Sequence, residues 1–221
     1  MARGGSKGLP GKNLLPLAGR PVVAWSVLAA RSARLVDRTI LSTDDPAIAA
    51  AGREAGAEVP FLRPRELATD DASIHDGLIH ALDQAGRGFD YVVLLQAASP
   101  LRTGDDIDGV IGTCIARAAP ACLSVAPIEK VYWTFTLRTD GRLEQLLGAE
   151  WQARRRQDLP QAYAPNGAVY VARIDWYRQH RIFLTPETVA HVMPSERSFD
   201  LDTAMDMKII SALFGAQTEI G

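Results

Sequence analysis

Short apolar runs alternate with segments of helical periodicity along most of this chain. This alternation limits the available folds more than any other feature of the sequence. The apolar runs are aliphatic or β-branched and are bounded by polar residues; they lie at 39–42, 91–95, 122–125 and 168–171. Continuous apolar runs of this length are typical of strands that are covered on both faces, as in a parallel sheet. We therefore expect a sheet buried between two layers of other structure.

The segments between and after these runs have the apolar spacing of helices. In one of them, Ile107, Val110, Ile111 and Cys114 recur at the spacing of a single helix face. The predicted helices are 21–33, 74–85, 107–118 and 203–214. Strands that alternate with helices of this length predict an α/β fold with a mainly parallel sheet, and we expect residues 1–221 to form a single domain.

The stretch from about 128 to 165 departs from this rhythm. It carries several aromatic residues and a turn signal at Asp140-Gly141, which together indicate a small antiparallel excursion. An aromatic protrusion of this kind can serve as an oligomerisation element, or it can be a locally packed β-lobe. The sequence leaves both interpretations open.

The charge balance argues against a nucleic-acid-binding protein. The chain has 24 basic and 26 acidic residues, a formal net charge of −2, whereas nucleic-acid binders usually have a basic excess. Cys114 and Cys122 fit no common zinc or redox spacing and are interpreted as reduced, half-buried thiols. No apolar stretch has the length of a membrane span, and the first residues do not form a signal peptide. We expect a soluble, cytoplasmic protein.

A glycine-rich, cationic segment lies at residues 2–13. Four glycines let the backbone approach a ligand closely, and Arg3, Lys7 and Lys12 add three cations. This combination suits a polyphosphate, because Arg and Lys neutralise different phosphate oxygens. The spacing matches neither a Walker A loop nor a dinucleotide fingerprint. The alternative interpretation is a mobile, solvated basic loop.

The position of this loop raises a question about the first strand. A glycine-rich loop of an α/β fold follows a strand, but only Met1 and Ala2 precede Arg3. We therefore expect either that the chain starts further upstream or that its first strand is truncated.

A pair of carboxylates near the end of the sequence is the second functional signal. In an extended segment Asp200 and Asp202 project to the same face, and such a pair suits Mg²⁺. Helix capping is the alternative, and it explains Asp202 better than Asp200. The acidic pairs at 44–45, 70–71 and 105–106 precede predicted helices and are interpreted as capping residues.

The third signal is Gln96, which ends the apolar run 91–95 ahead of Ser99-Pro100. Ligands bind at the carboxyl ends of strands in α/β folds, so this amide is placed to recognise a base or a sugar. A strand cap is the alternative. The four histidines show no metal-binding spacing, and we assign them no catalytic role.

Together these segments resemble the CMP-sialic acid synthetases (acylneuraminate cytidylyltransferases), which activate acidic nine-carbon sugars. The motifs that carry the resemblance are Arg3-Gly4-Gly5-Ser6-Lys7 with Gly11-Lys12-Asn13, Leu95-Gln96 with Ser99-Pro100-Leu101-Arg102, Arg156-Gln157-Asp158-Leu159-Pro160 with Asn166-Gly167-Ala168-Val169-Tyr170, and Phe199-Asp200-Leu201-Asp202-Thr203. Ala98 stands where this family more often has Thr, and Ile74 where it often has a second Ser. The motifs run in the family's order over essentially the whole chain.

The resemblance implies a Rossmann-like nucleotidyltransferase fold, dependence on Mg²⁺, and a homodimer in which the protrusion reaches the neighbouring active site. It implies these CTP-binding residues: Arg3, Gly4, Gly5, Ser6, Lys7, Lys12, Asn13 and Ser73. It implies these sugar-binding residues: Gln96, Lys130, Arg156 and Tyr170, of which Lys130 and Arg156 come either from the same subunit or from its partner. Arg3, Lys12 and Asp202 would be catalytic, with Mg²⁺ on Asp200 and Asp202.

The implied reaction is transfer of CMP from CTP to the anomeric hydroxyl of a sialic-type acid, with release of pyrophosphate. One alternative is a cytidylyltransferase for legionaminic, pseudaminic or 3-deoxy-octulosonic acid. The other is a sugar-nucleotide-binding module without turnover.

Overall fold

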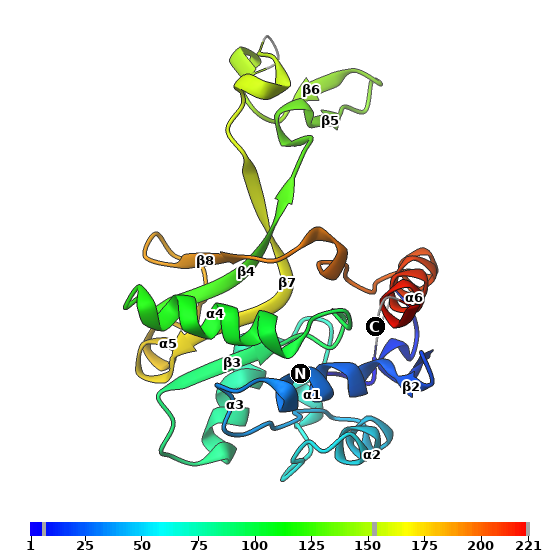
Figure 1. Cartoon of the computed structure of the whole chain (residues 1–221), viewed down its shortest axis with the longest axis vertical. Helices are drawn as coiled ribbons and strands as arrows, with labels where there is room; N and C mark the ends of the chain where they lie inside the picture. The colour runs from blue at the N-terminus through cyan, green and yellow to red at the C-terminus, as the bar shows by residue number, and fades with distance from the viewer. Residues whose placement is uncertain (6–7, 152–153, 220–221) are drawn as a thin grey trace.

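The computed structural model describes residues 1–5, 8–151 and 154–219 and is built around a four-stranded sheet (Figure 1). Its strands are β3 (Tyr91–Leu95), β7 (Ala162–Arg173), β4 (Ala121–Ile128) and β8 (Val189–Val192), in that spatial order. β8 pairs parallel with β4, whereas β7 pairs antiparallel with both β3 and β4. Three strands therefore share one direction, as predicted, but the sheet is mixed because β7 returns from the protrusion alongside β4.

The predicted helices are confirmed. They are α1 (Val22–Ser32), α3 (Ile74–Ala85), α4 (Gly104–Ala116) and α6 (Ala204–Glu219). A further helix, α2 (Pro46–Glu54), begins directly after the acidic pair 44–45, where a helix was expected. The helix α5 (Ile174–His180) was not predicted, and the same holds for the short pair β1 (Pro16–Leu17) and β2 (Arg20–Pro21). Single 3-10 turns lie at Lys12–Leu14, Arg65–Leu67, Val131–Trp133, Ala149–Trp151, Arg156–Asp158 and Ser195–Arg197. The run 39–42 forms only an isolated parallel bridge between Ile40 and Glu58 instead of the predicted strand.

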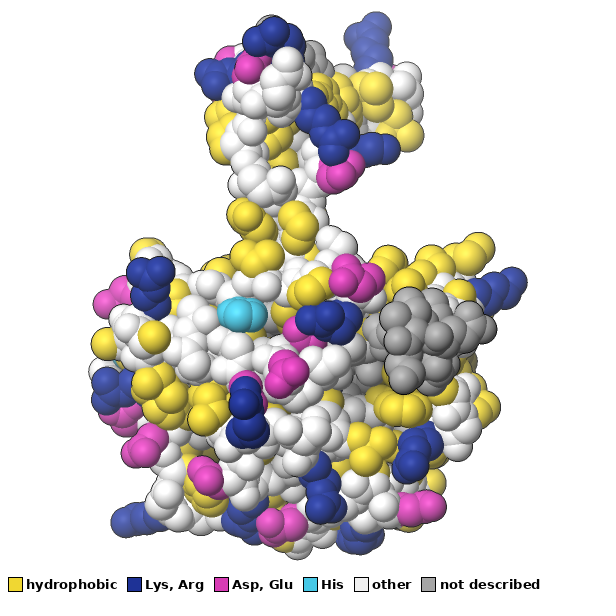
Figure 2. Space-filling model, in the orientation of Figure 1, with side chains coloured by type: hydrophobic (Ala, Val, Ile, Leu, Met, Phe, Trp, Pro, Cys, Tyr) yellow, Lys and Arg dark blue, Asp and Glu magenta, His cyan; other side chains and the backbone are white. Residues whose placement is uncertain are grey.

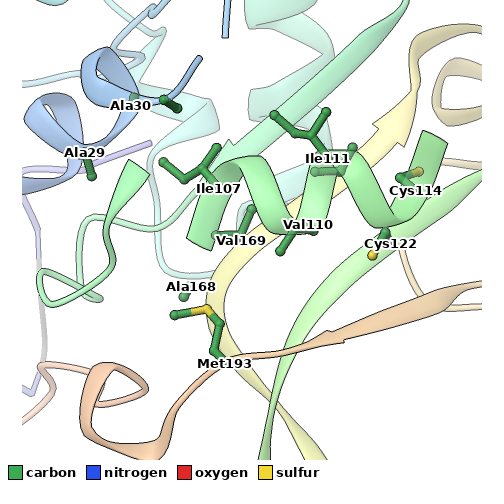
Figure 3. Packing of buried hydrophobic residues seen from close by; sticks show 12 residues of the cluster. Ala29, Ala30, Ile107, Val110, Ile111, Cys114, Cys122, Ala168, Val169 and Met193 are labelled. Carbon is green, nitrogen blue, oxygen red and sulfur yellow. The ribbon is translucent and has the colours of Figure 1, made fainter. Parts of the chain in front are cut away.

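Helices cover both faces of the sheet. On one face, α1 and α4 pack against it, and the fully buried side chains Ile107 and Val110 of α4 meet Val169 of β7 (Figure 3). On the other face, Leu78 and Leu82 of α3 pack with the opposite side chains of β3 and with α5. Because both faces are covered, the strands are apolar on both sides, which explains their continuous apolar runs.

The two cysteines lie in the layer between α4 and the sheet. Both are free thiols, as predicted, but they are fully buried instead of half-buried. Burial raises the pKa of the Cys114 thiol and raises that of Cys122 to about 12. Both therefore stay protonated near neutral pH and serve as small apolar groups.

The segment 128–165 forms a protrusion that extends away from the rest of the chain, which we call the body (Figure 1). β4 and β7 pair antiparallel out to Ile128 and Ala162, and β5 (Phe135–Leu137) pairs with β6 (Leu143–Gln145) further out. This confirms the predicted antiparallel excursion. No helix among the described residues is both long enough and apolar enough to cross a membrane.

Candidate active site

Three chain segments that are distant in sequence meet at the carboxyl end of β3. The Leu201 N–H donates to the Ala98 carbonyl at 2.8 Å, which attaches the segment before α6 to the loop after β3. The Lys12 ammonium then joins the glycine-rich segment to the same place, donating to the Leu201 carbonyl at 3.0 Å. The structure thus brings together the three signals that the sequence analysis singled out.

Lys12 and Asp202 form the central contact of this site. Lys12 Nζ lies 3.0 Å from Asp202 Oδ1, and only 18% of the lysine side chain is exposed, against 72% for the aspartate. The neighbouring Asn13 is buried and donates to the Arg3 carbonyl at 2.9 Å, which fixes the two ends of the glycine-rich loop against each other. Its Oδ1 atom has no hydrogen-bond partner among the described residues. Ser6 and Lys7, predicted to bind phosphate, lie outside the described residues.

Two aspartates outside the predicted site hold the start of the loop. Asp44 Oδ1 accepts from the Gly4 N–H at 3.1 Å, and Asp70 pairs with Arg3 at 2.7 Å. A Cβ atom at Gly4 would lie 2.8 Å from the Asp45 carboxylate, so this position has little room for a side chain. The capping interpretation is therefore right for Asp45, which accepts from two N–H groups of α2. The capping interpretation is wrong for Asp44 and Asp70, because their carboxylates instead contact the glycine-rich loop, which lies far from them in the sequence.

Asp200 is half-buried beside Asp202. Ser99 Oγ donates to Asp200 Oδ1 at 2.5 Å. Burial raises the pKa of the Asp200 carboxyl and the charge of Asp202 raises it further, while Ser99, Lys12 and Arg102 act in the opposite direction; the net effect is a raised pKa. Two carboxylates that repel each other in this way are stabilised by a cation.

The donor set is compatible with Mg²⁺. This ion uses one or two carboxylates and takes its remaining oxygens from phosphates and water. Among the described residues no group of three or more His, Cys, Asp or Glu side chains is arranged to hold a metal by itself. Asp200 and Asp202 would therefore bind Mg²⁺ together with a substrate phosphate, and this assignment stays a prediction.

Gly167 lets β7 pass close to Asp200. Its φ is +74°, and a Cβ atom there would lie 2.7 Å from Asp200 Oδ2. The register of β7 against β4 shifts between Leu123 and Val125, so that extra residues of β7, including Asn166 and Gly167, bulge at the site. Asn166 fixes this bulge by donating to Ser198 Oγ at 2.8 Å.

Gly167→Ala is expected to lower the free energy of unfolding by about 3 kcal/mol, because it adds a clash with Asp200 to a backbone conformation that disfavours side chains. Urea denaturation measures this difference. Gly141→Ala is the matched control: Gly141 also has a positive φ, +81°, but nothing lies within 4 Å of the added methyl group. It should cost only about 1 kcal/mol. Equal losses for the two variants would contradict the close approach to Asp200.

Of the predicted sugar-binding residues, Gln96 and Tyr170 lie in the body next to the group formed by Lys12, Asp200 and Asp202. Gln96 follows β3, and its carbonyl accepts from Arg102 Nη1 at 3.2 Å. The Tyr170 ring is half-buried against Phe183, with 5.3 Å between ring centroids. Burial raises the pKa of Tyr170, and the charge of Asp200 raises it further.

Three further predicted ligand residues are Ser73, Lys130 and Arg156. No described contact joins them to Lys12, Asp200 or Asp202. Ser73 caps α3, accepting from the His75 N–H at 3.2 Å. Lys130 and Arg156 lie on the protrusion, and Arg156 pairs there with Glu129 at 2.8 Å. The protrusion points away from the body (Figure 1), whereas Lys12 and Asp202 lie in the body.

Arg102 was not singled out by residue reasoning, although it lies in the motif Ser99-Pro100-Leu101-Arg102. It is fully buried and donates to the Ala168 carbonyl at 2.6 Å as well as to Gln96, which ties the end of β3 to the β7 bulge. Burial lowers the pKa of its guanidinium to about 10, and the charges of Asp106 and Asp200 partly offset this effect. The group stays charged at neutral pH and adds positive potential below Asp200.

The fold and the site define the class of protein as an α/β nucleotidyltransferase. In this class a cationic glycine-rich loop meets a pair of aspartates at the carboxyl end of a central strand. Comparison with known proteins narrows the class. The model of the cytidylyltransferase family matches residues 1–184, so the chain belongs to the cytidylyltransferase family.

Several curated relatives carry specific names. An N-acylneuraminate cytidylyltransferase of Streptococcus agalactiae is 35% identical over 96% of this chain, but the match covers only 52% of the relative, so the chain spans about half its length. A CMP-N,N'-diacetyllegionaminic acid synthase of Legionella pneumophila is 31% identical over 99% of this chain and 95% of its own. A pseudaminic acid cytidylyltransferase of Campylobacter jejuni is 27% identical over the same shares of the two chains.

Solved structures confirm the fold. A CMP:2-keto-3-deoxy-manno-octonic acid synthetase complexed with CTP superposes with a TM-score of 0.70 at 19% identity, covering 98% of this chain and 96% of its own. A 4-diphosphocytidyl-2C-methyl-D-erythritol synthase from Anaerococcus prevotii gives a TM-score of 0.64 at 10% identity, covering 92% and 93%. The predicted Rossmann-like nucleotidyltransferase fold is therefore confirmed.

Proposed function

We propose that the protein transfers CMP from CTP to the anomeric hydroxyl of a sialic-type nonulosonic acid and releases pyrophosphate. The observation that carries this proposal is the 3.0 Å contact between Lys12 and Asp202. It joins a loop suited to a triphosphate with a carboxylate pair suited to a divalent cation. Membership of the cytidylyltransferase family supports the nucleotide, and the names of the relatives support an acidic sugar as acceptor.

In this reaction the protein's main tasks are positioning and neutralisation of charge. The loop N–H groups with Arg3 and Lys12 would hold the CTP phosphates, and Lys12 would stabilise the charge that develops as the acceptor hydroxyl attacks the α-phosphorus. Asp200 and Asp202 would hold Mg²⁺, which supplies neutralisation of phosphate charge and lowers the pKa of a bound hydroxyl. Gln96 and Tyr170 would face the sugar, and Ser73 the nucleoside.

The protrusion supports a homodimer. Its exposed large apolar side chains are unusual for a surface that faces water: Leu137, Leu143, Leu146 and Tyr163. Figure 2 shows hydrophobic side chains on the protrusion and at its base. A second copy that covered them would bring Lys130 and Arg156 to the neighbouring site, where two cations suit the carboxylate of a sugar acid. The buried free thiols are compatible with a reducing, cytoplasmic environment.

The test is pyrophosphate release from CTP with a panel of sialic, legionaminic, pseudaminic and octulosonic acids, and with ATP, GTP and UTP as control nucleotides. Turnover with CTP and the sialic acid supports the proposal. Turnover with legionaminic or pseudaminic acid alone would move the assignment to another cytidylyltransferase. Tight CTP binding without pyrophosphate release, for any acceptor, would contradict catalysis and favour a binding module.

A further inference from the structure

The carboxylate pair of the site lies on a connecting segment rather than on a helix or a strand. This segment, residues 193–203, joins β8 to α6 and contains the 3-10 turn Ser195–Arg197. Backbone hydrogen bonds attach it near its two ends. The Met193 N–H donates to the Val125 carbonyl at 2.8 Å, and the Leu201 N–H donates to the loop after β3 at the same distance. The positions of the two carboxylates therefore depend on what holds the residues between these bonds.

Arg197 attaches the middle of this connecting segment to the first turn of α4. Its Nε atom donates to Asp106 Oδ2 at 2.9 Å, and its Nη2 atom donates to Asp106 Oδ1 at 2.8 Å. Two parallel hydrogen bonds between a guanidinium and a carboxylate fix their relative orientation as well as their distance. Because Arg197 precedes Asp200 closely in the sequence, this attachment limits where the carboxylate pair can lie.

Asp106 offers Arg197 a rigid acceptor. Its side chain is buried, and its Oδ2 atom accepts from both the N–H and the hydroxyl group of Thr103, each at 2.9 Å, in the capping box of α4. Burial by itself would raise the pKa of this carboxyl, but the hydrogen bonds from Arg197 and Thr103 outweigh burial, and the pKa is lowered. Asp106 is therefore charged at neutral pH, and the helix start sets its orientation.

The start of α4 is itself attached to the strands that build the site. Arg102 directly precedes the capping residue and donates to the carbonyls of Gln96, after β3, and Ala168, within β7. Burial lowers the pKa of its guanidinium, and the charges of Asp106 and Asp200 both act against this effect. A continuous series of contacts thus links the loop after β3, the start of α4 and the connecting segment.

We propose that Asp106 and Arg197 are positioning residues for the carboxylate pair: they set where Asp200 and Asp202 lie relative to a divalent cation and a substrate phosphate. Asp202 is 72% exposed, so packing does little to fix its carboxylate and the position of its backbone matters more. The inference rests on the proposed function, because that reaction gives the carboxylate pair its role.

Arg197→Gln tests this role, because it removes the charge and the paired hydrogen bonds but keeps a polar side chain. We expect the amide hydrogen of Leu201 to exchange about tenfold faster or more. Mg²⁺ should tighten CTP binding in the unmodified protein, measured by calorimetry with Mg²⁺ and with EDTA, and the variant should lose about tenfold of this gain. The Mg²⁺ concentration for half-maximal pyrophosphate release should rise by a similar factor. Arg197→Lys should be intermediate, because a lysine supplies charge without the planar pair of donors.

Asp106→Asn should reproduce the effects of Arg197→Gln, and Asp108→Asn is its matched control. Asp108 is a second buried aspartate of α4, and it accepts from Arg34 and from the N–H of Leu35, so it holds the segment after α1 instead. The control makes the same chemical change in the same helix and should give a comparable loss of melting temperature. Its Leu201 exchange and its Mg²⁺ dependence should match those of the unmodified protein.

The double variant Asp106→Asn/Arg197→Gln should lose no more than Arg197→Gln alone, because the two residues act as one pair. Additive losses would overturn the proposal, and so would Leu201 exchange in Arg197→Gln that equals that of Asp108→Asn. Faster exchange with unchanged Mg²⁺ dependence would assign the pair a structural role only, and CTP binding that Mg²⁺ does not tighten in the unmodified protein would also contradict the proposal. Exchange and CTP binding need no acceptor sugar. Absence of pyrophosphate release would therefore count against the proposed function, while these two measurements would still decide the positioning role.

Discussion

Replacing Lys12 with alanine is expected to lower kcat for pyrophosphate release by about 10³-fold. The reason is that Lys12 is the cation that meets the carboxylate pair, with Nζ 3.0 Å from Asp202. The variant would lose a charge that acts most strongly on the transition state, when negative charge develops on the phosphates. Steady-state release of pyrophosphate at saturating CTP and acceptor measures this effect.

A purely structural role for Lys12 makes a different prediction. The Lys12–Asp202 pair is largely exposed on the aspartate side, and pairs of this kind contribute about 0–1 kcal/mol to the free energy of unfolding. Lys12→Ala should therefore remain folded, with a melting temperature within a few degrees of the unmodified protein. Lys208→Ala, which removes an exposed lysine of α6, is the matched control and should keep full turnover. A Lys12→Ala variant with unchanged kcat would contradict the catalytic assignment.

Local patterns were sufficient to predict most of the body. The apolar periodicity of 74–85 predicted the bounds of α3, because one face of that helix is buried against the sheet. The same reasoning gave β3 and the core of α4. It missed the direction of β7, because strand direction depends on where the chain returns from the protrusion, and no residue pattern reports this. It also assigned a strand to 39–42, where the structure has only a bridge at Ile40.

The residue types of the candidate site could be predicted from the sequence, but the contacts between those residues could not. Glycines and cations indicated a phosphate loop, and the spacing of Asp200 and Asp202 indicated a shared face. That Lys12 meets Asp202 across 190 positions follows only from the fold. Asp44 and Asp70 show the same limit, because capping explained them locally while their partners, Gly4 and Arg3, lie far away in the sequence.

Charge at the site also depends on groups that sequence patterns do not reveal. Arg102 is a buried cation whose partners are the backbone carbonyls of Gln96, just after β3, and of Ala168, within β7. Together with Lys12 it lowers the cost of holding Asp200 ionised next to Asp202. Lys12 and Arg102 therefore balance the charges of Asp200 and Asp202, and a triphosphate with a divalent ion would add opposite charges to both sets.

Asp202→Asn is expected to raise the Mg²⁺ concentration for half-maximal turnover by about tenfold or more. The exposed carboxylate of Asp202 would be one of the two protein ligands of the ion, and an amide oxygen without charge binds a hard divalent cation more weakly. A Mg²⁺ titration of pyrophosphate release at fixed CTP measures the shift. Excess Mg²⁺ should restore part of the turnover, because the half-buried Asp200 remains in place.

The matched control for this titration is Asp105→Asn. Asp105 is an exposed aspartate in the first turn of α4, so the variant makes the same chemical change away from the Lys12–Asp202 contact. Its Mg²⁺ titration should coincide with that of the unmodified protein. The charge of Asp202 also raises the pKa of Asp200, so its loss by itself eases ionisation of the remaining carboxylate. A weaker Mg²⁺ response in Asp202→Asn therefore has to come from the lost ligand, and a titration unchanged from that of Asp105→Asn would contradict the metal site.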